Sequence, residues 1–226
     1  SLPAKKAATI AAIAEGALLG AYSFNKFRVD SKVNRQASLK SVTIYSALAK
    51  KAEAKEAIKS AAIIGEYTCL VRDLINTPPS HLTPDSFCKE ITDLVKKVGG
   101  SAIGLKVTIM NDSQLKSKGY GGITAVGQGS ANPPRLLQIS YTPVKAKAKK
   151  SYAYVGKGIT FDTGGLALKP AAGMEAMKSD MSGAAAVSAA VVAIAELKLN
   201  VAIDAWAPLA ENMPSDTATR PSDIIT

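Results

Sequence analysis

The sequence predicts an α/β sandwich with a mixed or mostly parallel sheet. Segments with strand periodicity alternate with segments of helical periodicity after residue 76, and glycine or proline separates most of them. The composition, 47% hydrophobic and 20% charged, is typical of a globular protein and argues against disordered and coiled-coil chains. A length of 226 residues is compatible with one domain or with two small ones.

The first third of the chain is predicted to be helical, with one short strand. Ala, Ile and Leu recur at helical spacing over residues 7–24, and a long Ala-rich helical pattern covers residues 48–75. Residues 41–46 alternate apolar and polar side chains with period two, so we expect a strand there. The run over residues 76–80 ends the long helix, because its two prolines lack an N–H donor and restrict the residue before them.

Helices and strands are expected to alternate in the rest of the chain. Thr83 is suited to an N-cap and Pro84 to the first helical position, and the helix that they begin is expected to end near Lys97, before two glycines. The other expected elements are strands over residues 105–110, 135–143, 151–161 and 200–209, a glycine-rich loop over residues 119–129, a solvated turn over residues 144–150, and a helix over residues 182–197. This alternation is the basis for the α/β class.

The net charge of +10 is not evenly distributed along the chain. Residues 1–60 carry 11 basic and 4 acidic side chains, residues 61–150 carry 12 and 6, and residues 151–226 carry 5 and 8. A basic surface can indicate an anionic partner, but these lysines stand among alanines without interleaved aromatic residues, so nucleic-acid binding is not expected. The last segment, with a net charge of −3, is the one suited to attract cations.

Missing motifs argue against several functional classes. The chain has no GxxxxGK[ST] P-loop, no complete dinucleotide fingerprint and no G-x-S-x-G nucleophile elbow. Its single histidine, His81, cannot build a histidine-rich zinc site. Cys69 and Cys88 fit no metal or redox spacing, and the chain has no uninterrupted apolar run of about 18 residues. We therefore expect a reduced, cytoplasmic protein with no membrane contact.

Residues 155–181 contain the side chains best suited to chemistry. Asp162 follows the end of an expected strand, and Asp180 precedes a small-residue helix whose positive end favours a carboxylate. Lys157 lies between two glycines in a segment expected to be buried, where it needs a paired carboxylate or a divalent metal that holds its amine neutral. Lys169 follows a glycine-rich turn. Each residue alone also fits a structural role, as a cap, a turn aspartate or a solvated lysine, and their combination favours a site.

The segment VGKGITFDTGGLALKPAAGMEAMKSDMSGAAAV resembles the metal-binding core of the leucyl aminopeptidases, the cytosolic metallo-exopeptidase family M17. Two other segments, RDLINTPPSHLTP at residues 72–84 and ENMPSDTATRPSDIIT at residues 211–226, resemble further signatures of that family, in the same order. The resemblance is weak before Arg72 and highly specific from there onward.

The resemblance implies a role for each candidate residue. Lys157, Asp162 and Asp180 correspond to ligands of two divalent metal ions, Mn²⁺ or Zn²⁺, with Asp162 bridging them. Lys169 corresponds to the catalytic lysine that polarises the scissile carbonyl, and Met177 to a position lining the pocket for the first side chain of the substrate. The implied reaction is hydrolysis of the N-terminal peptide bond of peptides, with leucine and other apolar residues preferred.

The resemblance also implies an architecture for the whole protein. We expect residues 76–226 to be the first part of a three-layer catalytic domain, residues 51–75 a linking helix, and residues 1–50 the end of a smaller α/β N-terminal domain. The second family signature, Asn-Thr-Asp-Ala-Glu-Gly-Arg, supplies two more ligands and the catalytic arginine, and it does not occur in this sequence. We therefore expect a chain truncated at both ends and inactive in isolation, whose full-length form is a homohexamer.

Two other functions remain open at this point. One is a non-catalytic basic scaffold or nucleic-acid-binding subunit, which salt-dependent retention on DNA would favour. The other is a different two-metal hydrolase that uses the same carboxylates, which a pocket that accepts no free α-amine would favour.

Overall fold

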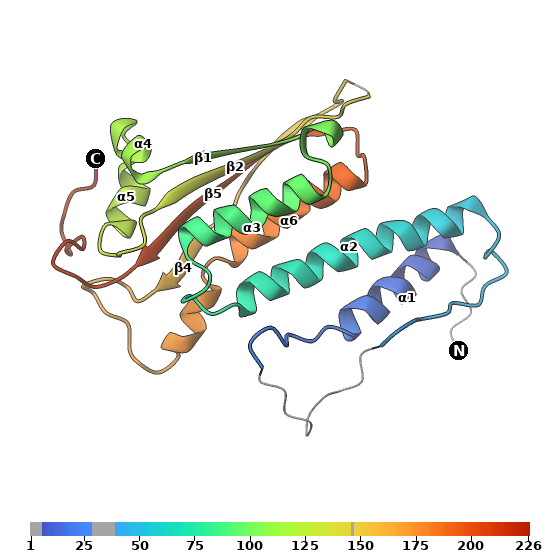
Figure 1. Ribbon diagram of the computed structural model, residues 1–226, viewed down its shortest axis with the longest axis horizontal. Helices are drawn as coiled ribbons and strands as arrows, with labels where there is room; N and C mark the ends of the chain where they lie inside the picture. The colour runs from blue at the N-terminus through green and yellow to red at the C-terminus, as the bar shows by residue number, and fades with distance from the viewer. Residues whose placement is uncertain (1–5, 29–38, 146) are drawn as a thin grey trace. The chain divides into compact units, whose positions relative to one another are not determined.

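The computed structural model describes residues 6–28, 39–145 and 147–226 (Figure 1). The chain divides into two compact units, Ser1–Asp73 and Leu74–Thr226, and the boundary lies inside the long helix α2 (Ala52–Asn76). The finer division at residues 50 and 75 stays a prediction.

The first unit contains α1 (Ala7–Gly20) and most of α2. Arg72 ties the two helices together, because its Nη1 atom donates to the carbonyl of Leu19 at 3.0 Å. Its guanidinium also lies 5.3 Å from the centroid of the Tyr22 ring, at cation–π distance. The helical prediction for this part of the chain is confirmed, with α1 ending and α2 beginning four residues inside the expected ranges.

Residues 41–46 do not form a strand, so the prediction made for them is wrong. Ile44 instead packs its side chain against a small core of Ile10 and Ala54. A strand needs a neighbour to satisfy its backbone N–H and C=O groups, and in the described part of the chain every strand belongs to the second unit. Period-two alternation without a pairing partner was therefore not enough to form a strand.

The second unit is built on a five-stranded mixed sheet, which confirms this part of the fold prediction. Its strands are β1 (Leu105–Met110), β2 (Arg135–Tyr141), β3 (Ser151–Val155), β4 (Gly158–Asp162) and β5 (Ala202–Asn212). β5 pairs antiparallel with β2 and parallel with both β3 and β4, and β1 pairs antiparallel with β2. The single strand predicted over residues 151–161 is thus divided into two strands, and both pair with β5.

The sheet is not mostly parallel, because two of its four strand pairings are antiparallel. The chain between β1 and β2 forms two short helices, α4 (Asp112–Ser117) and α5 (Gly121–Gly127). α5 lies in the segment predicted to be a glycine-rich loop. Helices of six and seven residues are only about 10 Å long, shorter than the strands that they connect. The chain re-enters the sheet at the end where it left, and β2 runs antiparallel to β1.

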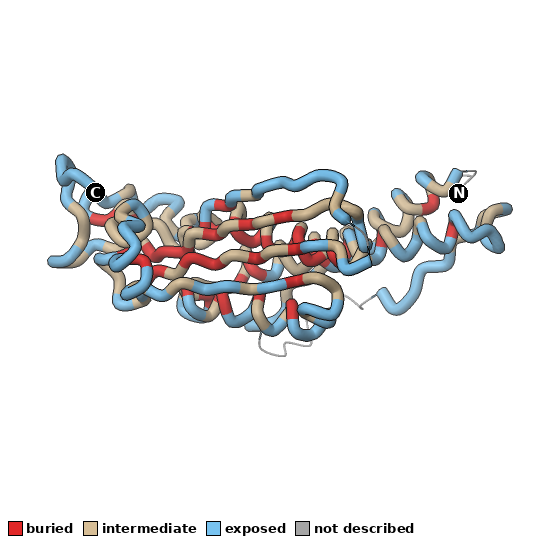
Figure 2. The backbone as a smooth tube through the Cα atoms, turned by 90° about the horizontal axis from the view of Figure 1, so that it is seen from above, coloured by how far each residue is buried: buried red, intermediate tan, exposed pale blue. Residues whose placement is uncertain are grey.

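Two helices, α3 (Pro84–Lys97) and α6 (Ser182–Glu196), pack against the sheet and run alongside its strands in Figure 1. α3 starts as predicted: the Thr83 hydroxyl accepts from the Ser86 amide at 3.3 Å, and the Ser86 hydroxyl accepts from the Thr83 amide at 2.8 Å. The buried residues of this unit lie mainly on β2 and β5 and on the two helices that cover them (Figure 2). On the covered face, β2 and β5 contribute Leu137, Ile139, Ile203, Ala205, Ala207 and Leu209 to the core.

The opposite face of β2 and β5 is only partly buried and more polar. The Asp204 carboxylate there accepts from the Ser140 hydroxyl at 2.6 Å and from the Gln138 amide at 3.2 Å. A shallow cavity of about 460 Å³ on this face is lined by apolar residues, among them Val155 and Trp206, and by no carboxylate or amine. It is therefore a surface feature distinct from the charged cluster described below.

The segment Met174–Glu196, which ends with α6, is long and apolar enough by composition to cross a membrane. Seven residues of α6 are buried in the second unit, mostly alanine and valine. Packing against the sheet therefore accounts for the apolar character of this helix.

Candidate functional site

Lys157 lies in the two-residue break between β3 and β4, where the chain passes the start of α6. The Lys157 carbonyl accepts a hydrogen bond from the Ala184 amide at 2.8 Å. A Cβ atom on Gly156 would lie 2.2 Å from the Gly183 carbonyl oxygen, and one on Gly158 would lie 2.5 Å from another backbone oxygen. The flanking glycines are therefore required by close backbone packing. The Lys157 side chain is 56% exposed, so the expectation of a lysine buried in a strand is wrong.

Asp162 is the last residue of β4, at the carboxyl end of two parallel strands. The chain then turns through Gly164 and Gly165, whose φ angles of 88° and 69° lie in the left-handed region that favours glycine. The Lys169 amide donates to the Thr163 carbonyl at 2.9 Å and closes the loop. This closure brings the Lys169 side chain back beside Asp162.

A short 3-10 helix, η2 (Met174–Ser179), carries Met177 and leads into Asp180. It is anchored by Lys178, whose ammonium donates to the carbonyl of Asn76 at 2.9 Å. The N-cap of α6 is Met181, which makes no capping bond through its side chain. Asp180 is therefore not the helix cap that its position suggested, and its carboxylate is directed at the two lysines.

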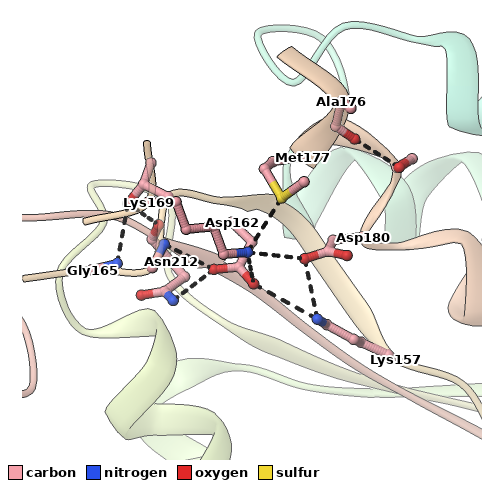
Figure 3. Close-up of polar contacts among 11 residues, drawn as sticks. Lys157, Asp162, Gly165, Lys169, Ala176, Met177, Asp180 and Asn212 are labelled. Atoms are coloured by element: carbon pink, nitrogen blue, oxygen red, sulfur yellow. Dashed lines mark hydrogen bonds and ion pairs between the residues drawn. The ribbon is translucent and has the colours of Figure 1, made fainter. Parts of the chain in front are cut away.

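The four charged side chains predicted from the sequence lie together and form what we call the charged cluster: Lys157, Asp162, Lys169 and Asp180 (Figure 3). The Lys169 ammonium lies 2.9 Å from the Asp162 Oδ2 atom and 3.7 Å from the Asp180 Oδ2 atom. The Lys157 ammonium lies 3.1 Å from the Asp180 Oδ2 atom and 3.7 Å from the Asp162 Oδ2 atom. One oxygen of each carboxylate thus faces both cations. Asp162 is the most enclosed of the four, with a side chain 13% exposed.

These contacts shift the protonation equilibria of the cluster. Burial alone would raise the pKa of Asp162, but hydrogen bonds from Lys169, Asn212 and the Gly164 amide outweigh burial and hold that pKa well below its usual range. The hydrogen bond to Asp162 raises the pKa of Lys169. Asp162 is therefore a carboxylate and Lys169 an ammonium ion at neutral pH.

Met177 and Asn212 complete the immediate surroundings. The Lys169 ammonium lies 3.2 Å from the Met177 sulfur, so Met177 contacts the lysine predicted to be catalytic. Asn212, which the sequence analysis did not select, donates through Nδ2 to the Asp162 Oδ1 atom at 2.8 Å. The position of Asn212 at the end of β5, which is parallel to β4, could have pointed to it. The sequence analysis expected that strand to end at residue 209, three residues earlier.

The cluster provides part of a coordination sphere for divalent metal ions. Carboxylate oxygens suit Mn²⁺, Mg²⁺ and Zn²⁺, and a lysine can add a nitrogen donor only as a neutral amine. Among the described residues, no three His, Cys, Asp or Glu side chains are placed together so that they could hold a metal ion. Catalytic zinc usually has at least three protein ligands and one open position. Lys157, Asp162 and Asp180 thus fit a metal centre as a partial set of ligands.

The fold and the cluster define an α/β protein with a candidate metal centre at the end of its parallel strands. The catalytic domain of the cytosol aminopeptidase family matches residues 69–226, and the chain belongs to this family. The resemblance recognised in the sequence is confirmed.

Individual relatives agree with this assignment. A probable cytosol aminopeptidase of Streptomyces avermitilis is 48% identical over 227 residues, which cover 100% of this chain and 43% of the relative. The bottromycin maturation enzyme BotP in complex with Mn matches with a TM-score of 0.82 at 38% identity, over 97% of this chain and 43% of BotP. The cytosol aminopeptidase from Coxiella burnetii matches with a TM-score of 0.79 at 28% identity, over 96% and 43%. The chain thus spans less than half the length of these relatives.

Proposed function

We propose that the protein carrying this chain is a metallo-aminopeptidase, which removes the N-terminal residue from peptides and prefers leucine and other apolar residues. The observation that carries the proposal is the convergence of Lys157, Asp162, Lys169 and Asp180 at one end of the sheet, in a member of the cytosol aminopeptidase family. Peptides with a free N-terminal amine are the substrates that this site would take.

Two divalent metal ions, Mn²⁺ or Zn²⁺, are the proposed cofactors. Asp162 would contact both ions, and Asp180 and the neutral amine of Lys157 would complete the ligands from this chain. BotP, which shares this fold, was crystallised in complex with Mn. Bound divalent ions lower the pKa of water and stabilise negative charge on oxygen.

Lys169 is the proposed catalytic residue of this chain. It keeps its proton beside Asp162, so it can donate a hydrogen bond to the scissile carbonyl as negative charge develops on that oxygen. Met177 contacts Lys169 and would line the pocket for the first side chain of the substrate. An apolar thioether at that position fits a preference for apolar residues.

The whole protein is proposed to complete the site and the fold. The matched relatives are more than twice as long as this chain. Further sequence would supply an aspartate, a glutamate and an arginine to the active site, and a helical layer on the partly buried face of the sheet. Residues 1–50 would end a smaller N-terminal α/β domain, residues 51–75 would link it to the catalytic domain, and the complete protein would be a cytoplasmic homohexamer.

The test is peptidase activity of the full-length protein on a leucyl chromogenic amide with Mn²⁺. We expect turnover that Asp162→Ala abolishes. Asp204→Ala is the matched control, because it removes a hydrogen-bonded aspartate of the same unit outside the cluster. Absence of turnover with Mn²⁺ and Zn²⁺, or full activity of Asp162→Ala, would overturn the proposal. Robust turnover by the isolated 226-residue chain would contradict the expected need for further sequence.

A further inference from the structure

We infer that Asn212 is a positioning residue, which holds Asp162 so that one carboxylate oxygen is reserved for metal. The inference rests on the proposed function, because it concerns a proposed ligand, and it assigns a role to a residue outside the ligand set. The juxtaposition comes from strand register: Asp162 ends β4, Asn212 ends β5, and the two are paired in the parallel ladder. The two residues are 50 positions apart in the sequence.

The two oxygens of the Asp162 carboxylate have different partners (Figure 3). Oδ1 accepts from Asn212 Nδ2 at 2.8 Å and from the Gly164 amide at 3.0 Å, both neutral donors. Oδ2 faces the ammonium groups of Lys169 at 2.9 Å and Lys157 at 3.7 Å. The two oxygens of an ionised carboxylate are equivalent, so these neutral hydrogen bonds act on orientation: they hold the carboxylate with one oxygen toward Asn212 and Gly164 and the other toward the cations.

Asn212 is itself held in place. Its backbone carbonyl oxygen accepts from the Thr163 amide at 3.0 Å and from the Thr163 hydroxyl at 2.8 Å. Its side-chain oxygen lies 2.9 Å from the position of a Cβ atom on Gly165, so a side chain there would meet the amide. Thr163, the residue after Asp162, thus holds the backbone of the asparagine, and the asparagine side chain orients the carboxylate.

A second asparagine in the same unit provides a matched control. Asn132 donates through Nδ2 to the Glu211 Oε2 atom at 2.9 Å. Glu211 precedes Asn212 in β5 and is 9% exposed. Both asparagines therefore make the same kind of hydrogen bond to an enclosed carboxylate, and only Asn212 contacts a proposed metal ligand.

The experiment measures the dissociation constant for Mn²⁺ by titration calorimetry in the full-length protein, its Asn212→Ala variant and its Asn132→Ala variant. Residues that orient metal ligands typically change metal affinity by about 10- to 100-fold when they are removed. We expect a loss of that size for Asn212→Ala and a change of less than about threefold for Asn132→Ala. Melting temperatures in EDTA report on general destabilisation, which both variants should show.

Three outcomes would overturn the inference. Equal Mn²⁺ affinity of the two variants would assign Asn212 a purely structural role and leave the proposed function standing. An unchanged affinity in Asn212→Leu, which keeps the volume and lacks the donor, would do the same if Asn212→Ala does not fold. Failure of the unmodified protein to bind Mn²⁺ would overturn the proposed function together with the inference.

Discussion

Lys157 and Lys169 contact the same two carboxylates, but they are held differently. The Lys157 backbone is locked against the first turn of α6, and its ammonium lies nearest to Asp180. Lys169 reaches the cluster from a loop, and its ammonium lies nearest to Asp162 and to the Met177 sulfur. These arrangements suit separate roles: a side chain on a fixed backbone for coordination, and a side chain with a retained proton for the substrate carbonyl.

At the residue scale, replacing either lysine by methionine should separate these roles. Lys169→Met removes a donor to the developing oxyanion, so we expect kcat to fall by about 10²- to 10³-fold with little change in the dissociation constant for Mn²⁺. Lys157→Met removes a proposed ligand and should weaken Mn²⁺ binding instead. Kinetics at saturating Mn²⁺ and calorimetric titration measure the two effects. Weaker Mn²⁺ binding in Lys169→Met and unchanged binding in Lys157→Met would reverse the assignment.

At the element scale, the packing of α6 against the β3–β4 break sets the position of the cluster. Gly156 and Gly183 let the two backbones touch, and the segment η2 is anchored by Lys178 to the carbonyl of Asn76. Three segments far apart in the sequence therefore meet at the site: the β3–β4 break, the end of α2 and the start of α6. A side chain added where the β3–β4 break touches the start of α6 should displace both segments.

Gly156→Ala is the substitution that tests this packing. Its Cβ atom would lie 2.2 Å from one backbone oxygen and 2.7 Å from the Ala184 nitrogen, so we expect a loss of about 1–3 kcal/mol in the free energy of unfolding. Gly122→Ala in α5 is the control, because nothing lies within 4 Å of its Cβ position and alanine favours a helix. Urea unfolding of the two variants measures the difference. Equal midpoints would contradict the close packing.

At the scale of the whole molecule, metal binding should be linked to the stability of the folded state. The positive charge of the chain lies in residues 1–150, and residues 151–226, which contain the cluster, have a net charge of −3. Metal ions that bind only the folded state stabilise it by mass action, by about 2.7 kcal/mol at a free concentration of about 100 times Kd. Removal of metal should therefore lower the melting temperature of the full-length protein.

Differential scanning fluorimetry with excess Mn²⁺ and with EDTA measures that effect. We expect a higher melting temperature with Mn²⁺ and no such difference in Asp162→Ala, which lacks the proposed bridging carboxylate. A shift of the same size in Asp162→Ala would show that Mn²⁺ stabilises the protein through another site.

Local signals in the sequence were sufficient for several elements and for the candidate residues. Thr83 and Pro84 predicted the start of α3 because capping depends on residues three positions apart. Lys157, Asp162, Lys169 and Asp180 could be selected because they lie within 24 consecutive residues, between expected strands and a helix. Family membership followed from the same continuous segment, together with two shorter ones.

The tertiary structure decided what depends on contacts between distant residues. Residues 41–46 have strand periodicity, but their unit contains no strand among the described residues, and the antiparallel direction of β2 is visible only in its pairing with β1 and β5. The pairing of Asp162 with Asn212 joins residues 50 positions apart, so it becomes visible only when β4 and β5 lie side by side. The sequence by itself determined which side chains are candidates for the chemistry, because those lie close together along the chain. The fold determined how they are oriented, because orientation depends on hydrogen bonds from neighbouring strands.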